Sequence, residues 1–157
     1  MVQLPESELV RKSFTIKRMD LPPSVLLTKR SLLRWFALSF GLISKQESRD
    51  TVLNVLDAVF FFLLSKKKSP TTLELQSYIE SKHSKKISEK LLRYHLNRLI
   101  LLELLQRKQN KYFLNSSPSG ERNSIVESFS YWVKRPVNES LDGIEKVLGK
   151  ISQSYGK

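Results

Sequence analysis

Four polar side chains between Lys90 and Asn97 are spaced so that they share one face of a helix. Lys90, Arg93, Tyr94 and Asn97 follow one another at i, i+3, i+4 and i+7. Lys and Arg can donate to guanine, Asn can pair with adenine, and all four can contact phosphate. This face therefore offers hydrogen bonding to a nucleic acid, and the alternative is an ordinary solvated helix face.

The charge around this face favours an anionic partner. Residues 82–111 contain nine Lys and Arg against two acidic residues, within a chain of 157 residues and net charge +12. Residues 1–49 contain nine against four, whereas residues 112–157 contain six against five. Because the basic charge is concentrated on and before the face, the simplest predicted partner is double-stranded DNA.

Other basic residues flank the face on both sides. Arg107, Lys108 and Lys111, together with Tyr112, could enter a minor groove or lie against phosphates. The run 66–68 is equally consistent with a solvated loop and with a phosphate contact. The predicted DNA contacts are Lys85, Lys86, Ser88, Lys90, Arg93, Tyr94, Asn97, Arg98, Arg107, Lys108 and Lys111.

The sequence offers little for catalysis or for a cofactor. It has no glycine-rich phosphate loop, no nucleophile beside a base and no pair of carboxylates with a shared role. Cysteine is absent, and the two histidines, His83 and His95, are too few for a histidine-rich metal site. His95 adjoins an apolar stripe and is predicted to pack, while Asp57 is predicted to pair with a Lys or Arg. We expect neither an enzyme nor a cofactor.

A capped helix and a short hairpin must position these residues. Ser88 is a good N-cap for a helix that runs to about residue 102, and Ile87 with Leu92 has hydrophobic-staple spacing. Residues 104–108 and 111–114 are then predicted to form two short strands. Gln109 and Asn110 form the turn between them, with Asn110 the residue that tolerates a positive φ.

Two helices are predicted before this one. The first has a capping box at Ser44 and Glu47 and an apolar stripe that continues to Leu63. The second begins with a capping box at Thr71 and Glu74, and residues 81–86 form the turn after it.

The order of helices and hairpin, with the segments ISEKLLRYHLNRL and LLELLQRKQNKYFL, resembles winged helix-turn-helix transcription regulators of bacteria and archaea. The resemblance covers about residues 49–114 and implies a recognition helix at 88–102 and a wing at 104–114. These regulators usually have a glycine between helix and wing, where this chain has Glu103. The Lys-rich, cysteine-free composition favours an archaeal source.

The segments on either side have no specific match. Residues 1–26 form a basic arm that either lies across the surface or follows a phosphate backbone. Thr28 caps a helix that runs to about Ile43, within a segment of residues 27–48. Its first turns hold Lys29, Arg30 and Arg34, which either contact phosphate or are solvated.

Two amphipathic helices are expected at the C-terminus, after a linker at residues 115–120. The first is ended by Pro136, and the second is capped by Asn138. A heptad seam follows in the second helix at Leu141, Ile144, Leu148 and Ile151. This region, residues 120–157, is predicted to form a homodimer. The alternative is that it folds back on the N-terminal helix, against Leu32, Phe36 and Phe40.

Together these patterns predict a mainly α protein with a small β-hairpin: a winged helix-turn-helix core at 49–115 between an N-terminal helix and two C-terminal helices. The expected function is sequence-specific DNA binding as a cytoplasmic transcription regulator, with no membrane span. The alternative is a winged-helix scaffold or interaction module of a protein or RNA assembly, which binds nucleic acid without sequence preference.

Overall fold

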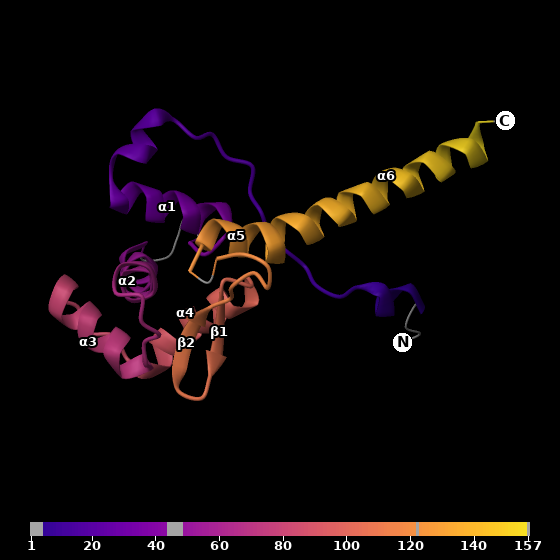
Figure 1. Cartoon of the computed structure of the whole chain (residues 1–157). Helices are drawn as coiled ribbons and strands as arrows, with labels where there is room; N and C mark the ends of the chain where they lie inside the picture. Colours follow the sequence, from indigo (N-terminus) through magenta and orange to yellow (C-terminus); the bar gives the residue numbers. More distant parts are fainter. Residues whose placement is uncertain (1–4, 44–48, 122, 157) are drawn as a thin grey trace. The chain divides into compact units, whose positions relative to one another are not determined.

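The computed structural model describes residues 5–43, 49–121 and 123–156. Over these residues the chain is mainly helical and contains one two-stranded antiparallel sheet (Figure 1). It divides into two compact units, Met1–Arg49 and Asp50–Lys157. The prediction of a mainly α fold with a small hairpin is confirmed.

The N-terminal unit contains two short 3₁₀ helices, η1 (Pro5–Leu9) and η2 (Pro23–Leu27), and the helix α1 (Lys29–Ser39). The extended chain before η2 is tied to α1 by two hydrogen bonds. The Lys17 amide donates to the Ser39 carbonyl at 2.8 Å, and the Trp35 indole donates to the Asp20 carbonyl at 2.8 Å. The backbone of the predicted basic arm is therefore held within its own unit at these two positions.

The helix α1 begins as predicted but ends earlier. The Thr28 hydroxyl accepts from the Ser31 amide at 3.1 Å, which confirms the N-cap. The predicted end at Ile43 is wrong, because Gly41 adopts a left-handed φ of 67°. The Gly41 amide then donates to Leu38 and the Leu42 amide to Ala37, a pairing that closes the helix at Ser39. The predicted capping box at Ser44 and Glu47 lies outside the described residues.

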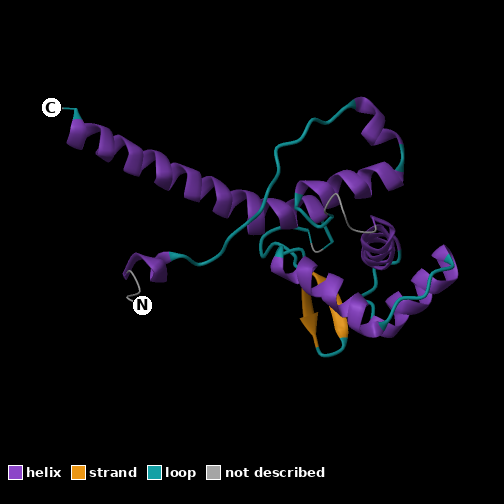
Figure 2. Ribbon diagram, turned by 180° about the vertical axis from the view of Figure 1, so that it is seen from behind, coloured by secondary structure: helices purple, strands orange, loops and turns teal. Residues whose placement is uncertain are grey.

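The helix α2 (Arg49–Phe60) starts at the last residue of the first unit and otherwise belongs to the second, and it continues into a single π-helical turn, η3 (Phe61–Ser65). The helices α3 (Thr72–His83) and α4 (Glu89–Leu101) follow, and then the hairpin of β1 (Leu105–Lys108) and β2 (Lys111–Leu114). Figure 2 shows the two strands beside these helices, joined by a tight turn. The core of the unit is aliphatic. Its buried side chains include Val52, Leu53, Leu56, Val59, Leu75, Ile79, Leu92, Leu96, Leu99, Leu105 and Leu114.

The segment after the hairpin is not a free linker. The Asn115 amide donates to the Leu104 carbonyl at 2.9 Å, and its carbonyl accepts from the Ser128 hydroxyl at 2.7 Å. The Trp132 indole donates to the Ser116 carbonyl at 3.2 Å. These bonds anchor the start of the C-terminal helices to the end of the hairpin.

The C-terminal region is one continuous helical run rather than two helices. It consists of α5 (Ile125–Phe129), the π turn η4 (Ser130–Lys134) and α6 (Arg135–Tyr155). The predicted break at Pro136 and cap at Asn138 are wrong, because the Arg135 amide bonds five residues back to Ser130. This wider turn lies directly before Pro136, the second residue of α6, and carries the helix past it.

Candidate nucleic-acid interface

The start of α4 is fixed by a cap and by a contact from α3. The Ser88 hydroxyl accepts from the Leu91 amide at 3.1 Å, which confirms the predicted N-cap. The Gln76 side chain donates to the Ile87 carbonyl at 2.7 Å, and Ile87 itself is buried. Because α3 extends to His83, the turn is shorter than predicted, with Ser84 in the left-handed region. Lys85 and Lys86 in this turn are exposed.

The helix α4 has one buried and one exposed face. Leu92, His95, Leu96 and Leu99 are buried, so the predicted packing role of His95 agrees with its position. On the other side, Lys90, Arg93, Tyr94 and Asn97 are exposed together, and Arg98 at their edge is half-buried. The predicted polar face therefore exists as a continuous exposed surface.

Two contacts within this face hold its cations in place. The Arg93 guanidinium lies 2.7 Å from the Glu89 carboxylate one turn earlier. The Arg98 guanidinium lies over the Tyr94 ring, 5.7 Å from its centroid. The Arg93 side chain is still 45% exposed in its pair. The two guanidinium groups are thus held in place on the helix by neighbouring side chains.

The end of α4 uses a left-handed residue where the sequence has no glycine. Glu103 has a φ of 65°, and the Leu104 amide donates back to the Leu99 carbonyl at 3.1 Å. The Asn115 amide group supports this residue, because it donates to the Glu103 carbonyl at 3.0 Å and to its carboxylate at 3.3 Å. This end turns the chain directly from α4 into β1.

The hairpin presents its basic residues next to the turn. Lys108 pairs with Lys111, and Arg107 pairs with Tyr112. The left-handed residue of the turn is Gln109, with a φ of 56°, so the prediction that Asn110 would take this conformation is wrong. The Arg107 side chain donates to the Gln109 carbonyl at 3.2 Å. Arg107, Lys108 and Lys111 are all exposed.

Tyr112 does not lie on this exposed basic surface. Its side chain is 1% exposed, so the predicted contact with a DNA groove is wrong. Its amide donates to the Pro70 carbonyl at 2.9 Å, and an isolated bridge pairs Thr71 with Lys111. The segment before α3 therefore lies against β2 like a very short third strand. Among the described residues the Tyr112 hydroxyl has no hydrogen-bond partner.

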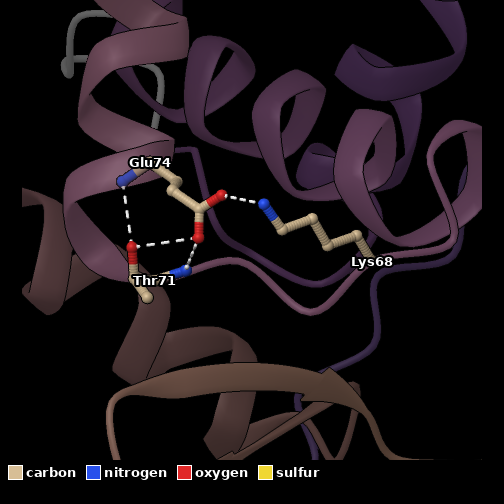
Figure 3. Close-up of polar contacts among 3 residues, drawn as sticks. All are labelled: Lys68, Thr71 and Glu74. Carbon is tan, nitrogen blue, oxygen red and sulfur yellow. Dashed lines mark hydrogen bonds and ion pairs between the residues drawn. The ribbon is translucent and has the colours of Figure 1, made fainter.

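The start of α3 restricts part of the basic loop before it (Figure 3). The Thr71 hydroxyl accepts from the Glu74 amide at 3.2 Å, and the Glu74 carboxylate accepts from the Thr71 amide at 3.2 Å, which confirms the capping box. The other carboxylate oxygen of Glu74 lies 2.5 Å from the Lys68 ammonium. The bond from Lys68, with that from the Thr71 backbone, lowers the pKa of Glu74. Within the loop, Lys68 is thus engaged in capping α3.

One polar cluster was not anticipated as such. The Asp57 carboxylate of α2 lies 2.8 Å from the His83 ring nitrogen and accepts from the Tyr78 hydroxyl at 3.1 Å. The predicted partner of Asp57, a Lys or Arg, is therefore wrong. Burial, followed by the nearby Asp57 charge, raises the pKa of Tyr78 to about 12. The only sequence signal was an acidic residue within an apolar helix.

No group of three or more His, Asp or Glu side chains among the described residues is arranged to hold a metal ion. None of the helices in this part of the chain combines the length and the apolar character that crossing a membrane requires. The exposed basic surface of α4 and the hairpin remains the strongest candidate site.

Comparison with known proteins identifies no relative: no family model, curated protein or solved structure matches the chain.

Proposed function

We propose that this protein is a DNA-binding transcription regulator with a winged helix-turn-helix domain. In this assignment α4 enters the major groove as the recognition helix, and the β1–β2 hairpin is the wing. The observation that carries the proposal is the exposed cationic surface shared by α4, the turn before it and the hairpin. Such a protein would act on the genome of a prokaryotic cell, in the cytoplasm.

The order of the elements supports the winged-helix assignment. The chain runs through α2, a short bridging segment at Thr71, then α3, α4 and the two hairpin strands. A helix-turn-helix needs two helices joined by a short turn, and α3 and α4 are joined through Ser84 and Ile87. The bridge between Thr71 and Lys111 adds the short third strand that fixes the hairpin beside the helices.

The distribution of charge supports a nucleic-acid partner. Nine Lys and Arg residues face only two acids over residues 82–111. Eight of the nine are exposed and Arg98 is half-buried, so most of this charge faces solvent. One of the two acids, Glu89, is paired with Arg93 and also suits the helix N-terminus electrostatically. A surface of this kind attracts a phosphate backbone and steers its approach.

The side chains on the exposed face of α4 support sequence reading. Asn97 can form two hydrogen bonds with adenine, and Arg93 or Lys90 can donate to guanine. The hairpin residues Lys108 and Lys111 suit phosphate contacts, which position a protein without specifying a sequence.

One observation favours a second candidate function. Arg93 and Arg98 are already held by Glu89 and Tyr94, and Arg107 lies over the Tyr112 ring. Guanidinium groups held in this way suit contacts with a backbone as well as with base edges. A winged-helix scaffold in a protein or RNA assembly, which binds nucleic acid without sequence preference, is therefore the alternative.

The experiment that separates these functions begins with selection of duplexes from a random pool by the full-length protein. Binding to the selected duplex and to a scrambled duplex of equal composition is then measured as salt is raised. A regulator retains its preference for the selected site after the nonspecific electrostatic contribution has been screened. Equal affinities at every salt concentration would support the scaffold, and no binding to either duplex would exclude the DNA-binding regulator.

A further inference from the structure

The helix α6 carries an apolar face that nothing in its own compact unit buries. No residue of α6 is buried. Leu141, Ile144, Leu148 and Ile151 are each about half-exposed, and Tyr155 is almost fully exposed. These residues follow one another at spacings of three, four, three and four. This is the a and d pattern of a coiled coil, with Leu141, Leu148 and Tyr155 at a positions.

The π turn keeps this face in line with the preceding helix. Phe129 in α5 and Val137 in α6 are eight residues apart, one more than a heptad. A π turn accommodates one extra residue, so the two side chains return to the same face. The stripe therefore extends across Pro136.

The composition of α6 is unfavourable for a helix whose apolar face stays unpacked. Gly143 and Gly149 lie inside the helix, and each costs about 1 kcal/mol relative to alanine. A Cβ atom at either position would meet nothing within 4 Å, so no close contact within the chain requires these glycines. Helices in proteins gain most of their stability from packing an apolar face rather than from intrinsic propensity, and the two glycines lower the propensity of α6 further.

Charge distinguishes the possible partners. Residues 135–157 contain four Lys and Arg against three acidic residues, whereas the whole chain has a net charge of +12. The charged residues of α6 that flank the seam are few: Glu145 lies beside it, while Glu139, Asp142, Lys146 and Lys150 lie on the opposite face. A nearly neutral helix is poorly suited to an anionic lipid surface, which selects Lys and Arg on the polar face. Two copies of the same helix can approach with little repulsion.

We propose that the covering partner is a second copy of this chain, packed against α6 in parallel. A parallel seam places Glu145 opposite a serine of the other copy, Ser140, which avoids like-charge contact. An antiparallel seam centred on α6 would bring the two Glu145 side chains together. Leu at a and Ile at d also suit bundles of more than two helices, so assembly beyond two copies is compatible with the same seam.

The first test measures mass in solution without DNA, so its outcome is independent of the proposed DNA binding. The full-length protein is expected to have the mass of two or more 18.3 kDa chains in light scattering and sedimentation. Leu148→Glu is expected to reduce the mass to that of one chain. Leu148 is 57% exposed, so the monomer can accommodate a carboxylate there, whereas the apolar seam between two copies cannot. Gln153→Glu, with the same charge change on the outer face, is the matched control and should assemble as the wild type does.

Two results would overturn the proposal. One is a wild-type protein that remains monomeric at tens of micromolar. In that case protection of α6 from hydrogen exchange would show that its own chain covers it, and binding to vesicles with anionic headgroups would show that a lipid surface does. The other is a Leu148→Glu protein with unchanged mass. Circular dichroism of both variants verifies that the helices and hairpin of the second unit still fold.

A second test determines the orientation, and it uses the absence of cysteine from the chain. Leu141→Cys and Tyr155→Cys each introduce the sole thiol at an a position. In a parallel seam each variant forms a disulfide with itself on mild oxidation. An assembled protein in which neither variant forms a disulfide with itself would overturn the parallel arrangement.

Discussion

At the scale of single residues, the proposed interface contains side chains that can contact base edges and side chains that can contact phosphates. On α4, Asn97 and Arg93 can pair with base edges, while Ser88 is used by its own helix as a cap. In the hairpin, Lys108 and Lys111 flank the turn without acidic partners on the opposite strand. The two kinds of residue predict different consequences of mutation.

Loss of the side chains that can contact bases is expected to reduce sequence specificity. Arg93→Ala combined with Asn97→Ala should weaken binding to the selected duplex by about 1–3 kcal/mol per lost base contact. Binding to scrambled DNA should change much less. Fluorescence anisotropy on both duplexes measures the difference. An equal loss on both would assign these residues to the phosphate backbone, and unchanged affinity would remove α4 from the interface.

Loss of a side chain that can contact phosphate is expected to weaken binding to DNA of any sequence. Lys108→Ala and Lys111→Ala should each make the dependence of log affinity on log salt shallower by about one unit. Lys146→Ala, on the outer face of α6, is the control and should leave the slope unchanged. A slope unaffected by either hairpin substitution would show that the hairpin does not contact phosphate.

The buried hydroxyl of Tyr112 predicts an unusual response to its removal. Because the hydroxyl has no partner among the described residues, Tyr112→Phe should be neutral or should raise the free energy of unfolding by up to about 1 kcal/mol. Tyr94→Phe, at an exposed tyrosine, is the control and should have little effect. Urea unfolding measures both. A clear loss of stability in Tyr112→Phe would show that the hydroxyl is hydrogen-bonded in solution.

At the scale of elements, local signals predicted the starts of helices and tertiary contacts decided the rest. The caps at Thr28, Thr71 and Ser88 were predicted from the sequence because a cap depends on residues three positions apart. The register of the α4 face also follows from local periodicity. The pairing of Asp57 with His83 joins residues 26 positions apart, which no local pattern encodes.

The helix run at the C-terminus shows a different limit of sequence reasoning. A proline normally ends a helix because it lacks an N–H and its ring meets the carbonyl four residues earlier. The π turn before Pro136 changes which carbonyls need donors, and this turn leaves no distinct residue signature. The π turn at Phe61–Ser65 could not be predicted for the same reason. The burial of Tyr112 depends on the distant segment at Pro70 and Thr71, which lies against β2.

The end of α4 provides a prediction about backbone conformation. Glu103→Gly and Glu103→Ala both remove the carboxylate that accepts from Asn115, but only glycine adopts a φ of 65° without strain. The glycine variant should therefore be more stable than the alanine variant by about 1 kcal/mol. Thermal and urea unfolding compare the two directly. Equal stability would indicate that residue 103 is not left-handed.

The cap of α3 gives a prediction about pH. The lowered pKa of Glu74 means that its stabilisation is present above its ordinary value of 4.5 and is lost as pH falls through the lower folded value. Glu74→Gln keeps a capping side chain but loses the ion pair with Lys68, at a cost of about 0.5 kcal/mol near neutral pH. The difference between variant and wild type should disappear at acidic pH. A difference that persists there would assign the cost to packing.

At the scale of the whole molecule, self-association through α6 would give the protein two DNA-reading modules. Two modules related by symmetry bind two half-sites about one DNA turn, or a multiple of it, apart. Selected duplexes are thus expected to contain an inverted repeat. Leu148→Glu should reduce affinity for the full site far more than for a half-site, as measured by titration of both.

The exposure of α6 has a consequence for the lifetime of the protein. Its only basic residues between Arg135 and Tyr155 are Lys146 and Lys150, both exposed on a helix that its own unit leaves unpacked. Local unfolding there admits a protease, and assembly suppresses that unfolding by mass action. Cleavage by trypsin at these two lysines should therefore slow as protein concentration rises. Dilute chains would be degraded first, so that abundance itself would protect the pool of assembled protein.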